Sequence, residues 1–120
     1  MNKKIKVSVA TDLTLDLLVS RADNQPEEDG WGWFKRDKDG FLLDPLNECR
    51  YSPSTDWAQG GPIIERNYID IIWDSGNNEW NASMIQGRFV EEGPTPLIAV
   101  MRCYVASKLG DVVEIPEELL

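Results

Sequence analysis

The chain has 120 residues, enough for one domain (1–120) with a single hydrophobic core and too few for two independent domains. Its 42% hydrophobic residues and five tryptophans predict a packed globule rather than a disordered chain. A formal net charge of −9 makes direct nucleic-acid binding unfavourable, because like charges repel. No stretch approaches the roughly 20 apolar residues of a membrane span, so we expect no membrane partner.

Only two cysteines are present, Cys49 and Cys103, and there is no histidine. The first residues, "MNKKIKVSVATDL", lack the long apolar stretch of a signal peptide, which predicts a cytoplasmic protein. A disulfide is then not expected, and two cysteines without histidine cannot form an ordinary structural zinc site. We therefore predict neither a metal nor a cofactor.

The N-terminal part predicts a strand followed by a helix. Ile5, Val7 and Val9 alternate with polar residues, which is typical of a strand with one buried face. From Thr11 the apolar residues follow a helical period, and the helix should end near Asp23. The sequence "DNQPEEDG" (23–30) then indicates a polar loop.

Residues 31–44 predict a β-hairpin, because Asp39-Gly40 suits the positive φ of a tight turn. The same "DKDG" hints at a calcium loop. That interpretation fails on spacing, since Lys35 and Leu46 would occupy positions that need carboxylates. A second hairpin is predicted from 68–73 and 80–85, with Trp80, Ala82 and Met84 on one face.

The helix predicted at about 95–109 has the clearest signals. Thr95 can cap it, Pro96 suits its first position, and Gly110 suits the positive φ just beyond its end. Its circumference is almost wholly apolar, with Arg102 as the one charge in the middle, so it should lie buried against a sheet. Residues 111–120 could form an extended acidic tail. Together these elements predict an α+β fold, with an antiparallel sheet of about four or five strands, this central helix and shorter helices.

The segment "YSPSTDWAQGGPIIER" (51–66) mixes polar, aromatic and turn-forming residues. We expect Ser54 to cap a short helical turn that Gly60 ends, one of the two glycines having positive φ, and Pro62 to open a second turn. That second helix start could attract an anion with help from Arg66. A purely structural interpretation is that the segment is a sharp turn whose apolar residues enter the core, with Asp56 or Glu65 paired to Arg102 or Arg66. If Arg102 is buried, we expect it to be the partner.

As a binding site, this segment supplies the following candidate residues: Ser54, Thr55, Asp56, Trp57, Gln59, Gly60, Gly61, Glu65 and Arg66. Arg102 and Gly110 are expected to have structural roles. No catalytic or metal-binding residue is assigned.

The same segment, together with "GPTPLIAVMRCYVASKLGDVVEIPEEL", resembles the NinX family of small phage and prophage proteins, a family without a known function. The resemblance is close over residues 51–120. In the first 50 residues, "DLTLDLLVSRA" is shorter than the family's usual helix and lacks its glycine and tryptophan. The resemblance implies expression in an infected or lysogenic bacterial cell, and it implies no catalytic residues.

Three functions are compatible with these observations. The first is a non-catalytic protein that binds and modulates a host or phage protein in the cytoplasm, with a homodimer left open. The second is a magnesium-dependent enzyme acting on nucleotides or nucleic acid through Asp56, Glu65 and Asp70, since no histidine is available for other common centres. The third is an acidic mimic of DNA. Exposed tryptophans would favour the first, although we expect at least three of the five to be buried.

Overall fold

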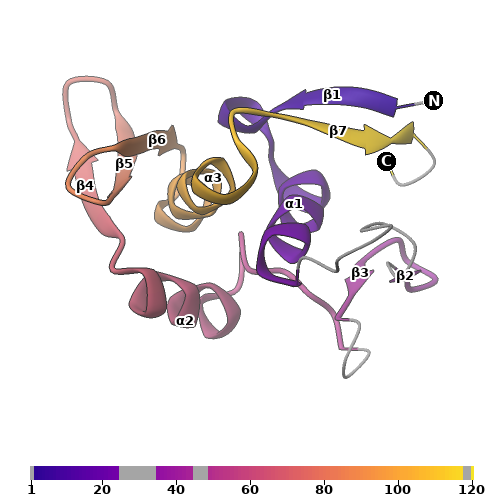
Figure 1. The fold of residues 1–120 in the computed structure, drawn as a ribbon. Coiled ribbons are helices and arrows are strands. Elements are labelled where there is room, and N and C mark those ends of the chain that lie inside the picture. Colours follow the sequence, from indigo (N-terminus) through magenta and orange to yellow (C-terminus); the bar gives the residue numbers. More distant parts are fainter. Residues whose placement is uncertain (1, 25–34, 45–48, 118–119) are drawn as a thin grey trace.

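A computed structural model describes residues 2–24, 35–44, 49–117 and 120. In these residues three α-helices and seven strands form an α+β fold, which confirms the predicted class. Figure 1 shows helix α3 between the other elements, with β4–β6 to one side and β1 and β7 to the other. No helix of this part combines the length and the apolar character needed to cross a membrane.

All strand pairs are antiparallel, as predicted, and in the described part they form three small sheets rather than one. The pairs are β1 (Asn2–Lys6) with β7 (Val112–Pro116), and β2 (Lys35–Arg36) with β3 (Leu42–Leu43). The third sheet has the order β4 (Asp70–Asp74), β5 (Glu79–Met84), β6 (Phe89–Gly93). Its third strand, β6, was not predicted. The segment 112–116, considered above as part of an acidic tail, pairs with the N-terminal strand.

Helix α3 (Pro96–Leu109) matches its prediction at both ends. Thr95 caps it, with its Oγ1 accepting a hydrogen bond from the Ile98 amide at 3.1 Å. Gly110 follows the helix with φ of 92°, a value that L-residues with side chains rarely adopt. Residues 97–106 are all buried, because α3 packs against the β4–β6 sheet on one side and α1 on the other.

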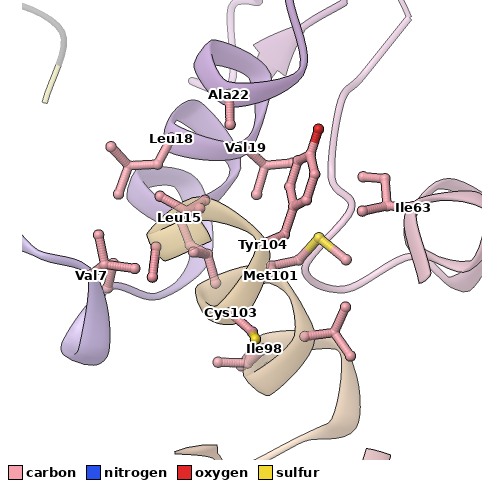
Figure 2. Close-up of a cluster of buried hydrophobic side chains, with 14 of the residues drawn as sticks. Val7, Leu15, Leu18, Val19, Ala22, Ile63, Ile98, Met101, Cys103 and Tyr104 are labelled. Atoms are coloured by element: carbon pink, nitrogen blue, oxygen red, sulfur yellow. The ribbon is translucent and has the colours of Figure 1, made fainter. Parts of the chain in front are cut away.

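The core forms where three helices meet. Helix α1 (Asp12–Asn24) contributes the predicted apolar stripe, including Leu15 and Val19, both with no exposed surface. Figure 2 shows these side chains against α3, with Ile63 of α2 (Trp57–Asn67) approaching from the other side. Burial of this cluster accounts for the arrangement of the helices, since apolar burial is the dominant favourable term in folding.

The first strand is shorter than predicted. It ends at Lys6, and Val7–Val9 form a 3₁₀ turn (η1) that redirects the chain into α1. The Ala10 amide donates to the Val7 carbonyl at 3.2 Å and closes this turn. Val9 therefore does not share the buried face expected for it, and its side chain is 67% exposed.

The first hairpin is confirmed within the described residues, where Gly40 has φ of 88°. Asp37 holds the turn by accepting hydrogen bonds from the Asp39 and Phe41 amides, both at 2.9 Å. Residues 31–34, and 25–30 of the predicted loop, lie outside the described residues, whereas Asp23 belongs to α1. The second hairpin is confirmed with β4 beginning at Asp70.

The prediction that at least three tryptophans are buried is not met by the three tryptophans that the structure describes. Trp57 is 54% exposed and Trp73 is 45% exposed, while Trp80 is only partly buried. Trp31 and Trp33 lie outside the described residues. The core is filled instead by leucine, valine and methionine side chains from α1 and α3, so the indoles at 57 and 73 remain at the surface.

Arg102 is buried, as expected, but the predicted ion pair with Asp56 or Glu65 is wrong. Its Nε donates to the Ala10 carbonyl at 2.9 Å, and its Nη1 donates to the Glu92 carbonyl at 2.7 Å. These bonds join the turn before α1 to strand β6. Arg102 thus satisfies backbone acceptors of two distant segments, a role that the planar guanidinium suits through its several fixed donors.

Glu91 lies beside Arg102 and is partly buried. Burial and the negative charge of Asp111 raise the pKa of the Glu91 carboxyl group, although Arg102 acts in the opposite direction. The folded chain therefore holds this proton more tightly than the unfolded chain. It follows that ionisation of Glu91 opposes folding as the pH rises above the ordinary value of 4.5.

We expect Glu91→Gln to melt at a higher temperature than the wild type at pH 7, because glutamine cannot ionise. The difference should shrink as the pH is lowered towards the ordinary pKa of glutamate, where the wild-type side chain becomes protonated too. Thermal melts followed by circular dichroism across this range provide the measurement. The exposed neighbour Glu92→Gln makes the same change in net charge and is the control. An advantage that did not depend on pH would contradict this interpretation of Glu91.

Candidate binding site at the start of helix α2

The predicted break in the middle of the 51–66 segment is absent. Helix α2 runs unbroken from Trp57 through Gly60, Gly61 and Pro62, and neither glycine is among the described residues with positive φ. A Cβ on Gly60 would lie 2.6 Å from Leu97 Cδ2 and 2.6 Å from the Pro53 carbonyl oxygen. Gly60 thus allows α2 to pack closely against α3. It does not form a turn, so the prediction that Gly60 ends a short helix is wrong.

The residue that caps α2 is Asp56, not Ser54 as predicted. The Asp56 carboxylate accepts a hydrogen bond from the Ala58 amide at 2.9 Å, as is typical of a helix N-cap. Ser54 is instead buried, and its amide donates to Asp16 Oδ1 of α1 at 2.9 Å. The contact with α1 fixes the approach of the chain to α2.

Gln59 was predicted as a binding residue, and its amide group is already engaged within the chain. Its Oε1 accepts a hydrogen bond from the Ser52 amide at 2.6 Å, and its Nε2 donates to the Arg50 carbonyl at 2.9 Å. The side chain therefore ties the first turn of α2 to the backbone of the loop that precedes it. Its role is to position the loop.

A cavity of about 220 Å³ lies where α2 and α3 begin. It is lined by three residues of the predicted segment and by the start of α3: Ser54, Thr55, Trp57, Thr95, Pro96, Leu97 and Ile98. The exposed Trp57 stands at its edge, while Leu97 and Ile98 supply an apolar wall that is buried in the core. The arrangement can accept a small, mostly apolar group with a few hydrogen-bonding atoms.

A second cavity, of about 230 Å³, lies along the side of α2. Gln59 and Arg66 line it, with Tyr51, Arg50 and Asp23 among their neighbours. Arg66 pairs with Asp23 at 3.2 Å, and the Tyr104 hydroxyl donates to the same carboxylate oxygen at 2.9 Å. Burial raises the pKa of both Tyr51 and Tyr104, so both phenols stay protonated at neutral pH. Arg66 and Asp23 are thus engaged with each other, while Arg50 pairs with Asp37 and Asp39 outside the cavity.

The nine candidate residues therefore do not form one site. Ser54, Thr55 and Trp57 line the first cavity, and Gln59 and Arg66 line the second. Gly60 is buried between α2 and α3, and neither Gly61 nor Glu65 lines either cavity. The sequence also missed the contribution of α3, although Thr95-Pro96 was recognised as a helix start. Nothing in the local pattern indicated that the two helix starts meet.

The three carboxylates considered as magnesium ligands do not lie together in the structure. Asp56 caps the start of α2, and Glu65 is exposed nine residues later, roughly 13 Å along the helix axis at 1.5 Å per residue. Asp70 lies beyond the end of the helix, in β4. Among the described residues, no group of three or more aspartates, glutamates or cysteines could hold a metal ion.

The two cysteines are both reduced. Cys49 is exposed, whereas Cys103 is buried in α3. Burial raises the pKa of the Cys103 thiol to about 12, because the interior disfavours the thiolate. Since the thiolate is the nucleophilic form, Cys103 is inert at neutral pH and acts as a small core residue.

Comparison with known protein families gives a match over most of the chain. The family model described as "Bacteriophage P22, NinX" matches residues 6–108, which is most of the chain. The match includes α1, both cavities and all of α3 except its last residue, so it extends well into the N-terminal half, where the resemblance is weaker. No curated protein matches the chain.

Proposed function

The chain belongs to the family of NinX of bacteriophage P22, and we propose that it is a phage or prophage accessory protein that acts by binding another protein. The partner would be a host or phage protein in the bacterial cytoplasm. In this proposal the protein has no catalytic activity of its own and modulates its partner by contact. The family supports the accessory role, and the binding role is argued from the surface of α2.

The observation that carries this proposal is the exposure of Trp57. A tryptophan that is 54% exposed leaves a large apolar surface in water, and tryptophan is the residue type most enriched at the energetic centres of protein interfaces. Its neighbours one turn along the helix surface, Gly60 and Gly61, carry neither a side chain nor a charge that would cover the indole. A cavity opens beside the indole. Exposed aromatic surface next to a hollow is the usual form of a binding centre.

The enzyme alternative has less support. The chain contains no histidine, and the carboxylates that would have to bind magnesium lie at different ends of α2 and in β4. We expect calorimetric titration with Mg²⁺ or Mn²⁺ to give no site tighter than roughly millimolar, because a dedicated site needs converging oxygen ligands. Tight binding together with hydrolysis of a nucleotide or nucleic acid would favour the enzyme instead.

The binding proposal is tested with tagged protein in a lysate of infected host cells. We expect Trp57→Ala to lose the partner that the wild type retrieves, since interface tryptophans often contribute at least 2 kcal/mol, roughly a thirtyfold change in affinity. Partners are identified by mass spectrometry. Tyr68→Ala is the matched control, because Tyr68 is an 86% exposed aromatic just beyond the other end of the same helix. An unchanged set of partners in Trp57→Ala would place the interface elsewhere.

A further inference from the structure

The cavity between the starts of α2 and α3 presents unused hydrogen-bond donors. In the described part of the chain, the amide N–H groups of Trp57 and Leu97 make no hydrogen bond, although both residues line the cavity. Each belongs to the first turn of a helix, where N–H groups have no partner within the helix. Two helix starts, each with positive partial charge, thus face the same space.

A third donor is the hydroxyl group of Ser54. Ser54 lines the cavity and is only 1% exposed, and among the described residues its Oγ is buried without a hydrogen-bond partner. A buried hydroxyl without a partner is unfavourable by an amount comparable to a lost hydrogen bond. An acceptor atom in the cavity would remove this penalty.

The other two hydroxyls of the lining are already engaged, because Thr55 donates to the Ser52 carbonyl and Thr95 accepts from the Ile98 amide. The remaining lining is apolar, and the cavity is small. Pro96, Leu97 and Ile98 form one wall, and the indole of Trp57 lies at the edge. The volume of about 220 Å³ is sufficient for one amino-acid residue. A ligand that fits must therefore combine a compact acceptor group with one apolar group.

We propose that this cavity binds the C-terminal residue of the partner protein, with an apolar last side chain. The terminal carboxylate accepts hydrogen bonds from the two free amides and from Ser54, and the side chain packs on Leu97 and Ile98. Capture of a chain end by backbone N–H groups is an established mode of peptide recognition. A chain end can enter through a single opening, whereas an internal segment must both enter and leave the cavity. A cavity of this size therefore suits a chain end better. This inference rests on the proposed protein-binding function.

The charge of Asp56 provides a specific test of this proposal. Its carboxylate caps the same helix start, so its negative charge opposes a second carboxylate nearby. Asparagine is an equally good N-cap and carries no charge. Asp56→Asn should therefore tighten binding of a peptide with a free C-terminus and leave the helix intact.

The experiment uses the full chain labelled with ¹⁵N and two synthetic peptides, acetyl-Gly-Gly-Leu with a free carboxylate and the same peptide with a C-terminal amide. We expect the free acid to shift the Trp57 and Leu97 amide signals in a saturable manner and the amide to shift them at least tenfold more weakly. Ser54→Ala should weaken binding of the acid about tenfold, the effect of one hydrogen bond to a charged group, and should fold normally. Asp56→Asn should tighten it severalfold.

Equal binding of both peptides, shifts at other residues, or no shift at millimolar concentrations of the acid would overturn the proposal. So would unchanged binding in both variants. These failures are distinguishable from failure of the proposed function. If Trp57→Ala still loses the lysate partner while neither peptide shifts the two amides, the α2 surface binds a protein but not its C-terminus.

Discussion

Replacing Gly60 with alanine is expected to lower the free energy of unfolding by about 1–3 kcal/mol, the usual effect of adding a methyl group to a packed interior. The new Cβ would lie 2.6 Å from two atoms, Leu97 Cδ2 and the Pro53 carbonyl oxygen. The leucine can rotate away, but the carbonyl belongs to the backbone of the loop that holds Ser54 in place. α2 and the loop at Pro53 would therefore have to move apart. Chemical denaturation provides the measurement.

The adjacent glycine is the matched control. A Cβ on Gly61 meets no atom within 4 Å, and the residue lies in the interior of the same helix. Gly61→Ala should therefore stabilise the protein by roughly 0.5–1 kcal/mol, because alanine loses less backbone entropy than glycine in a helix. Opposite signs for two neighbouring glycines would show that close packing at position 60, rather than the flexibility of a Gly-Gly pair, explains this part of the sequence. Equal effects would contradict that explanation.

The contrast between α3 and α2 shows which parts of the fold the sequence could predict. Thr95, Pro96 and Gly110 act through local backbone geometry, so the ends of α3 were predictable from the residues themselves. In α2 the local preferences of Gly60, Gly61 and Pro62 indicate a break, and packing overrides them. Helix propensities are weak compared with tertiary contacts, and here the contact with α3 decides.

Strand β6 and the composition of the cavity were missed for a related reason. The residues of β6, "FVEEG", follow no clean alternation, and the strand is defined by its pairing with β5. Trp57 and Leu97 are 40 positions apart, and only the packing of α2 on α3 brings both to one cavity. Ser54 and Thr55, which were predicted as binding residues, line this cavity. The half of that site contributed by α3 required the tertiary structure.

Arg102→Met should lower the free energy of unfolding by about 2 kcal/mol or more. Methionine fills much of the same volume but donates no hydrogen bond, so the buried carbonyl of Ala10 loses its partner and the link to Glu92 is lost. Arg88→Met is the matched control, because Arg88 is an exposed residue of the same type and should change stability by less than about 0.5 kcal/mol. Denaturation of both variants by urea gives the comparison.

Arg102→Lys separates the geometry of the side chain from its charge. Lysine keeps the positive charge near Glu91 and Glu79, but its single nitrogen cannot reproduce the two-directional contact of Nε and Nη1. If the two carbonyl contacts are what stabilises the junction of η1, α3 and β6, lysine should be nearly as destabilising as methionine. Full recovery of stability by lysine would instead show that attraction to the surrounding glutamates is the main contribution, and that the two backbone contacts follow from it.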